Sequence, residues 1–486
     1  MSAGSARVGI GHVPRRGATY SLLIGSVVAI LAAGLAIPEA FGHAAGSATP
    51  TGGLTLPSGP ARDYDPRLAP EYSDLSIVTS PPPPAGTALL ASDDGITPTT
   101  VTLGVILPGL GALASFGVDV SELDPSIQRT YWASAVARIN AAGGIDGRRL
   151  AVVYATASIL SPDSMRSACA SLTEDHHVFA VANVLGITGD PVLCVTRDHD
   201  TPYIGIDGED PSYYQISQGR LVTLEPSTAR TLSILVDRTA TLGAIRGRTV
   251  GVLHDTGPGG IDGAALRAML LARGARGVVD APLSDDDPLI VTGEVAQAEQ
   301  RMQRQRVSTV LLLTNAVYGT VFATQADQSH YSPTYFMGDL GFATAGDSFV
   351  SNMPPSFFRQ AYAVTTTEVG RGRGGLPESP LDLGCRLDYQ RFVGTAVPRD
   401  SADDVAALAS CAVAQILTMG LTADGPNPTR AGFSADLAQA GSFALPGFGR
   451  GLLAPGHLDA ADDVSLVAAR ADCQCYQAVD GFAPAS

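Results

Sequence analysis

The sequence predicts an α/β fold of two similar lobes, each built on a parallel sheet. Short apolar, β-branched runs alternate with helical stretches, and this alternation is typical of parallel strands joined by right-handed crossovers. One segment also recurs, because residues 147–154 (GRRLAVVY) are echoed by residues 247–254 (GRTVGVLH), and each feeds a turn and a helix. A chain of 486 residues is long enough for two such lobes.

The first elements follow from turn and cap residues. Residues 101–107 (VTLGVIL) form a short buried strand that ends at a Pro-Gly pair. Asp124 and Pro125 then supply an N-cap and a first-turn proline, so we expect a helix to begin there. Gly143 and Gly144 end this helix, since glycine accepts the left-handed conformation of a helix stop.

The rest of the first lobe repeats this pattern. We predict strands over residues 150–154, 178–184 and 202–206. Helices open between them at Ser161 and Asp190, each of which is followed by proline.

The second series of elements begins with the echoed strand over residues 247–254. Further strands are predicted over residues 307–314, 333–337 and 361–366, and a helix over residues 403–419. Two similar α/β lobes are therefore the simplest account of the body of the chain.

The N-terminus predicts export. Arg7, Arg15 and Arg16 precede an apolar run over residues 20–37, and small residues follow it. This is the pattern of a secretory signal, and the run is also long enough to remain as a transmembrane helix. We therefore interpret residues 1–45 as a signal peptide or a signal anchor, and expect the body outside the cytoplasm, secreted or membrane-anchored.

Residues 46–98 are rich in Pro, Gly, Ser and Thr and include four consecutive prolines at 81–84. Such a segment buries too little apolar surface to offset its ordering entropy, so we predict a disordered linker.

Charge excludes one class of partner. The chain has 47 acidic and 31 basic residues, a formal charge of −16, and every basic residue is arginine. Nucleic-acid binding requires a basic patch, so we expect no nucleic-acid partner. Neither a cofactor motif nor a metal motif stands out, and we expect a monomer.

One motif resembles a family hallmark. Residues 138–150 (RINAAGGIDGRRL) resemble the end of the first helix and the start of the second strand in type I periplasmic binding proteins of the branched-chain amino-acid (leucine/isoleucine/valine) group. Residues 252–255 (VLHD) and 335–339 (YFMGD) match later parts of the same family in the correct order.

The resemblance covers roughly residues 100–480 and implies two Rossmann-like lobes joined by a three-crossover hinge. It places residues 99–223 and 366–440 in the first lobe and residues 224–365 and 441–486 in the second. It also implies that a small polar ligand, such as an amino acid or an amide, binds between the lobes and is delivered to an ABC-type permease in the membrane.

Candidate ligand residues follow from this fold, because ligands of open α/β sheets lie beyond the carboxyl ends of the strands. The loops at those ends carry Ser115, Gly186, Thr188, Asp207, Glu209, Tyr318 and Asp339. The first three are candidates for an anionic or polar group, and Asp207 or Glu209 for an ammonium. Tyr318 and Asp339 are expected to reach the ligand from the second lobe.

Six cysteines in an exported chain favour disulfides over metal sites. Cys169 and Cys194 fall on successive helices that flank one strand, so a bond between them is reasonable. The pairing of the other four remains open, and we favour Cys385 with Cys411.

Two alternative functions remain at this point. Residues 256–263 (TGPGGIDG) come close to a dinucleotide fingerprint, but Asp262 occupies the third glycine position, which favours an ordinary turn over a nucleotide-dependent enzyme. A membrane-tethered ligand sensor of the same fold is the second alternative.

Overall fold

The computed structural model describes residues 54, 80–109, 124–158, 161–184, 188–256, 261–284, 288–340, 343–344, 346–347 and 349–485. The expected signal peptide or signal anchor lies outside these residues.

The first lobe contains a five-stranded parallel sheet with the order β2-β1-β3-β4-β5. Its strands are β1 (Thr100–Gly109), β2 (Arg149–Ser158), β3 (Ala180–Ala182), β4 (Tyr203–Gly205) and β5 (Leu221–Thr223). The helices between them are α2 (Pro125–Ala141), α3 (Pro162–Ala170), α4 (Asp190–Leu193) and α5 (Pro211–Ile216). Single π-helical turns, η3 (Ser171–Asp175) and η4 (Cys194–Asp198), extend α3 and α4.

The predicted start and stop of α2 are confirmed. The side chain of Asp124 accepts a hydrogen bond from the Ser126 N–H, and Pro125 is the first helical residue. Gly143 and Gly144 both have positive φ after the helix end. A Cβ on Gly144 would lie 2.0 Å from the Arg148 carbonyl oxygen, so this position also needs glycine for space.

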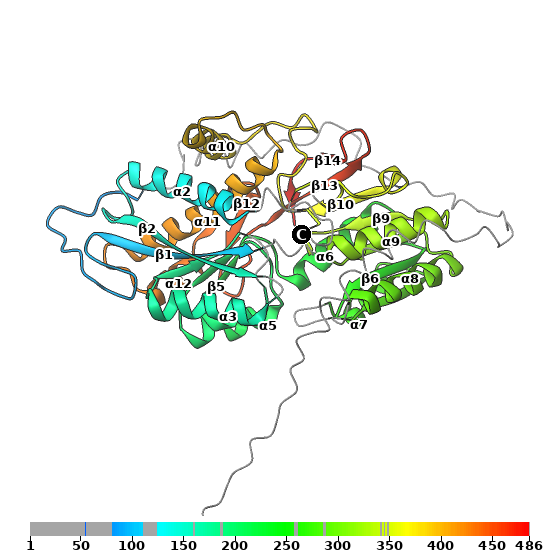
Figure 1. Ribbon diagram of the computed structural model, residues 1–486, viewed down its shortest axis with the longest axis horizontal. Helices are drawn as coiled ribbons and strands as arrows, with labels where there is room; N and C mark the ends of the chain where they lie inside the picture. The colour runs from blue at the N-terminus through cyan, green and yellow to red at the C-terminus, as the bar shows by residue number, and fades with distance from the viewer. Residues whose placement is uncertain are drawn as a thin grey trace, which may run out of the picture. The chain divides into compact units, whose positions relative to one another are not determined.

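Three helices from the later part of the chain complete the first lobe. They are α10 (Pro380–Val393), α11 (Ala402–Asp424) and α12 (Arg430–Leu437). Trp132 of α2 and Ile416 of α11 share one core cluster on one face of the sheet, and Met165 of α3 and Tyr213 of α5 share a second cluster on the other face. Figure 1 shows α2 and α11 on one side of these strands and α3 and α5 on the opposite side.

The second lobe contains a larger mixed sheet with the order β14-β13-β10-β9-β8-β6-β7. The parallel strands are β6 (Thr249–Asp255), β7 (Gly277–Leu283), β8 (Thr309–Leu313), β9 (Thr334–Met337) and β10 (Ala361–Thr365). The strands β13 (Asp463–Arg470) and β14 (Cys475–Ala478) add to it antiparallel, and β15 (Ala483–Pro484) pairs with β13. Its helices are α6 (Thr228–Thr241), α7 (Gly263–Ala272), α8 (Pro288–Arg304) and α9 (Ala316–Gln328), and η6 (Phe357–Arg359) is a 3₁₀ turn.

Within the described part of the chain, the backbone passes between the two sheets at three segments. The first crossover is residues 224–227, the second is residues 366–379, and the third is residues 454–462. The first and third run together, since the Ala460 N–H donates to the Thr223 carbonyl oxygen at 2.8 Å and the Ala461 N–H to that of Leu224 at 2.7 Å.

One boundary differs from our expectation. The hairpin of β11 (Gly441–Leu445) and β12 (Gly449–Leu453), which we expected in the second lobe, packs on the first. Phe443 and Leu453 are buried in the same cluster as α11 and the first sheet. Burial of these apolar side chains holds the hairpin against the first lobe. The chain enters the second lobe only at β13.

The linker prediction needs a correction over residues 80–98, which we call the strap. The strap lies along the first lobe and is bound there by Arg148. The Arg148 side chain is 1% exposed and donates hydrogen bonds to the Thr97 and Leu90 carbonyl oxygens at 2.7 and 3.0 Å. Ser80 Oγ donates to Asp146 Oδ1 at 2.8 Å. The strap gains order from hydrogen bonds made by the lobe, which its own composition does not reveal.

Helix α11 is long and apolar enough to span a membrane by length and composition. However, 78% of its most apolar window is buried inside the protein, and Ala412 to Leu417 lie in the core of the first lobe. We therefore interpret α11 as a core helix.

Three disulfides link the six cysteines. The structure joins Cys169 to Cys194 and Cys385 to Cys411, as we expected, with Cα atoms 6.4 and 6.2 Å apart. The third bond joins Cys473 to Cys475, a pairing that the sequence left open.

Candidate functional site

The predicted ligand residues fall into three groups. Ser115 and Gly186 lie outside the described residues. Thr188 is an exposed residue of the loop before α4. The remaining four follow strand ends or begin helices: Asp207, Glu209, Tyr318 and Asp339.

Glu209 lies in the loop after β4, and its side chain is turned inward. It is 3% exposed, and its two carboxyl oxygens accept the Gly189 N–H at 3.0 and 3.1 Å. Because Gly189 follows Thr188, this bond joins two of the loops that we predicted to bind ligand. Burial, reinforced by the negative charges of Asp207 and Asp210, raises the pKa of Glu209 to about 8.

Glu225 is a residue that we did not predict, and it lies in the first crossover. It is 6% exposed, and its pKa is raised well above the ordinary value by burial and by the charges of Asp339 and Asp207. Its electrostatic coupling to both residues places it among the predicted site residues. In the sequence, Glu225 stands two residues after the end of the buried strand β5 and otherwise looks like a loop residue.

Asp339 follows β9 and is 7% exposed. Its oxygens accept from the Thr344 hydroxyl, from the Thr365 hydroxyl at 2.6 Å, and from the N–H and hydroxyl of Thr366 at 2.8 and 2.7 Å. Burial still raises its pKa, in spite of these donors. Asp339 therefore fixes the end of β10 and the start of the second crossover, and contributes negative charge toward Glu225.

Tyr318 lies in the first turn of α9, half-buried against the core of the second lobe. Its N–H is bound by the N-cap side chain of Asn315 at 3.2 Å. The part of the Tyr318 side chain in ligand binding stays a prediction.

These carboxyl groups form what we call the acidic cluster: Asp207, Glu209, Glu225 and Asp339. Among the described residues, no arginine or histidine lies within ion-pair distance of Glu209, Glu225 or Asp339. Like charges held together out of water raise one another's pKa and favour either protonation or a bound cation. The cluster is thus able to accept a positively charged group.

The second crossover shows the opposite arrangement. Buried Glu368 has Arg371 Nε at 3.2 Å and Arg399 at 3.7 Å, and the Arg371 guanidinium lies 4.2 Å from the centre of the Phe482 ring. Here the protein supplies its own counter-charges, as a structural ion network requires.

The residues that suggested a nucleotide site have structural roles. Asp262 is the N-cap of α7, where it accepts from the N–H groups of Ala264 and Ala265. Asp280 pairs with buried His254 at 3.0 Å. Residues 257–260 lie outside the described part of the chain.

A cysteine–histidine group and a small cavity do not support a further ligand site among the described residues. Cys169, Cys194 and His199 come within 4.8 Å of one another, but the disulfide leaves neither cysteine a thiolate for a metal. A cavity of about 10 Å³ between α2, α10 and α11 has space for a single water molecule.

No family model matches the sequence, and no curated protein matches it either. Solved structures do match in fold. A possible leucine/isoleucine/valine-binding protein from Rhodopirellula baltica SH 1 is 16% identical, with a TM-score of 0.59, over 78% of this chain and 96% of that one. A fatty acid ABC transporter substrate-binding protein from Thermomonospora curvata is 13% identical, with a TM-score of 0.59, over 83% and 96%.

A third similar structure is a solute-binding protein of an ABC transporter from Rhodopseudomonas palustris BisB5, in complex with 3,4-dihydroxy benzoic acid. It is 15% identical, with a TM-score of 0.56, over 79% of this chain and 96% of that one. At these identities the likeness shows the fold. The chain has the two-lobed α/β fold of type I periplasmic binding proteins, as its glycine-rich hallmark predicts.

Proposed function

We propose that this protein is an extracytoplasmic solute-binding protein that captures a small molecule with a cationic group and delivers it to an ABC permease. The observation that carries the proposal is the acidic cluster, which lies at the carboxyl ends of strands and at the crossovers of a fold shared with solute-binding proteins. In such folds the ligand binds beyond those strand ends, and the lobes close on it.

The negative charge of the acidic cluster favours a cationic ligand over an anionic one. The similar structures include a complex with 3,4-dihydroxy benzoic acid, a fatty acid transporter protein and a possible leucine/isoleucine/valine-binding protein. A fatty acid or a benzoate would bring a further carboxylate to the cluster, and its burial there would be costly. An amino acid or an amine brings an ammonium, which offsets the charges of Glu209 and Glu225. We therefore favour a ligand that carries an ammonium.

Binding of such a cation is linked to proton release. Burial and neighbouring carboxylates raise the pKa of Glu209 to about 8 and that of Glu225 well above its ordinary value. At neutral pH the Glu209 carboxyl group therefore holds a proton in the unliganded protein, and the raised pKa of Glu225 acts in the same direction; an ammonium displaces the bound proton. Affinity for the cation should therefore increase as the pH rises toward 8.

The test is thermal unfolding of the purified protein with sets of three matched compounds: an amino acid, its deaminated acid and its decarboxylated amine. A ligand at 100 times its Kd adds about 2.7 kcal/mol to the stability of the folded state, which raises the midpoint visibly. We expect stabilisation by compounds that carry the ammonium, with the ligand recovered unchanged. Stabilisation by the deaminated acid alone would contradict the ligand class, and a chemically altered ligand would contradict binding without turnover.

Variants then test the site itself. Glu225→Gln retains the size and a hydrogen-bonding group but removes the charge, so we expect a loss of binding of about 2 kcal/mol or more. Glu174→Gln, at an exposed position of the same lobe, is the matched control and should bind like the wild type. Equal affinity of wild type and Glu225→Gln, with proton release intact, would remove Glu225 from the site.

A further inference from the structure

The three disulfides differ in how far water reaches them. Cys169 is fully buried and its partner Cys194 is half-buried, whereas Cys385 and Cys411 are 3% and 4% exposed. In the third bond, Cys473 is exposed while Cys475 is 3% exposed. A thiolate from solution attacks a disulfide at a sulfur that is exposed to solvent. Cys473 is the most exposed of the six cysteines, so it is the favoured point of attack.

This bond closes the turn between β13 and β14. Cys475 pairs with Arg470 across the hairpin, and Cys473 and Gln474 belong to the exposed turn between them. Gln474 has φ of +50°, a conformation that costs energy for a residue with a side chain. With a separation of only two residues, this crosslink also removes less chain entropy than the other two, which span 25 and 26 residues. The bond therefore contributes least to stability.

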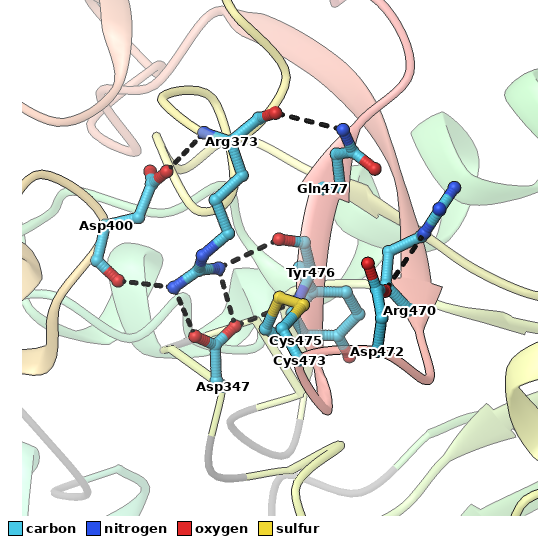
Figure 2. The surroundings of a disulfide bond; sticks show 9 residues. All are labelled: Asp347, Arg373, Asp400, Arg470, Asp472, Cys473, Cys475, Tyr476 and Gln477. Atoms are coloured by element: carbon cyan, nitrogen blue, oxygen red, sulfur yellow. Dashed lines mark hydrogen bonds and ion pairs between the residues drawn. A yellow bond between two sulfur atoms is a disulfide. The ribbon is translucent and has the colours of Figure 1, made fainter.

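The residue after the bond ties this turn to the second crossover. The Tyr476 N–H donates to Asp347 Oδ1 at 2.9 Å, and the Tyr476 carbonyl oxygen accepts from the Arg373 guanidinium at 2.8 Å. Arg373 also binds Asp347 directly and donates through its own N–H to Asp400 Oδ2 at 2.7 Å. Figure 2 shows the disulfide beside this network, with Arg373 between Asp347 and Asp400.

A second contact fixes the same strand to the crossover. The Ala478 N–H donates to the Gly370 carbonyl oxygen at 2.9 Å, and Gln477 donates to the Arg373 carbonyl oxygen at 2.9 Å. Gly370 has φ of +74°, and a Cβ there would lie 2.7 Å from the Tyr476 carbonyl oxygen. The start of β14 and the second crossover are thus packed backbone against backbone.

We propose that the Cys473–Cys475 bond is a thiol-exchange site, open to small-molecule thiols, whose redox state is transmitted to the second crossover. A thiolate attacks the Cys473 sulfur, a mixed disulfide forms there, and Cys475 leaves as a thiolate that takes up a proton. A second thiol then attacks the mixed disulfide, so that two thiols are oxidised to one disulfide while the cysteine pair is reduced to the dithiol. This inference does not depend on the proposed ligand.

Opening the bond releases the turn at Gln474 and removes the restraint on the strand that carries Tyr476. The hydrogen bond that the Tyr476 N–H donates to Asp347, and the one that its carbonyl oxygen accepts from Arg373, then open more often because the strand end can fray. The backbone of residues 366–379, which those bonds hold, is expected to exchange its amide hydrogens faster in the reduced protein.

The experiment uses the full, folded chain with glutathione under native conditions. Samples are quenched with acid and an alkylating reagent, then digested without further reduction, and each cysteine is assigned by mass spectrometry. We expect the Cys473 and Cys475 pair to open at least about tenfold faster than the other four cysteines, with the glutathione adduct on Cys473. Equal or faster opening of another pair, or an adduct on Cys475, would overturn the proposal.

Hydrogen exchange of the same samples tests transmission to the crossover. Residues 366–379 should exchange faster after reduction, and unchanged exchange would overturn that part of the proposal. The variant Cys473→Ser with Cys475→Ser is the control: it should show the faster exchange without glutathione and release no thiol under these conditions. The other four cysteines of the wild type serve as internal controls if this variant folds poorly.

Discussion

The Glu209 carboxyl group should make the stability of the first lobe depend on pH. It is 3% exposed, it accepts two hydrogen bonds from a single N–H donor, and its pKa is raised to about 8 by burial and by neighbouring carboxylates. In the unfolded chain the same group titrates near its ordinary value of 4.5. The variant Glu209→Gln keeps an oxygen for the Gly189 N–H but does not titrate.

The sign follows from proton binding. Between the two pKa values the folded state holds a proton that the unfolded state has lost, so raising the pH favours unfolding. The contribution of this group is fully present below about pH 4.5 and is lost as the pH rises through about 8. Each pH unit in that interval costs about 1.4 kcal/mol, so between pH 5 and pH 8 the wild type should lose about 4 kcal/mol more than Glu209→Gln.

Urea unfolding at several pH values measures this difference. Trp132 is the only tryptophan, is 1% exposed and lies in the core of the first lobe, so its fluorescence reports the lobe that contains Glu209. Asp175→Asn, at an exposed position of the same lobe, should follow the wild type. If wild type and Glu209→Gln lose stability in parallel from pH 5 to pH 8, then Glu209 is not protonated in the folded protein and the reasoning fails.

Three further predictions concern stability. Arg148→Ala should cost about 3 kcal/mol in urea unfolding and should make the strap sensitive to limited proteolysis, because three backbone carbonyl groups lose the donor that ties them to the lobe; intact resistance to protease would contradict this. Asp339→Ala should cost about 2–4 kcal/mol, and Asp339→Asn less, since the amide oxygen keeps part of the hydrogen bonds; equal costs would mean that these bonds matter little. Replacing Cys473 and Cys475 by serine should cost about 1.6 kcal/mol, against about 3.5 kcal/mol for the disulfide between α3 and η4, and similar losses would contradict the loop-length argument.

Much of the fold follows from local sequence patterns. Asp124 and Pro125 favour the start of a helix, and Gly143 and Gly144 favour its end, because proline has a fixed φ and glycine accepts positive φ at little cost. The apolar runs that form β6, β8 and β9 are buried on both faces, which gives them an unbroken hydrophobic signal. Such features depend on a few adjacent residues, and a single sequence contains them.

Features that depend on distant partners were missed or misplaced. The strap has the composition of a disordered linker, and it is ordered by Arg148, which lies about fifty residues further along the chain. The hairpin of β11 and β12 joins the first lobe because Phe443 finds an apolar partner there. Glu225 looked like an ordinary loop residue, because the charges that act on it belong to Asp207 and Asp339, which are distant in the sequence. Cys473 and Cys475 gave no signal that distinguished a bond between them from bonds to other cysteines.

The strongest reason to place a ligand at the acidic cluster is the contrast with the second crossover. Glu368 is as deeply buried as Glu225, and the protein gives it two arginines. Glu225 and Glu368 both have carboxylate neighbours, but among the described residues no arginine lies within ion-pair distance of Glu225, although arginine is abundant in the chain. A buried carboxyl group without a counter-charge either stays protonated or binds an external cation. The affinity for a ligand changes with pH in opposite directions in these two cases. A neutral ligand that accepts a hydrogen bond from protonated Glu225 would bind more weakly as the pH rises, whereas an ammonium would bind more tightly. The pH dependence of affinity therefore decides between them before the ligand itself has been identified.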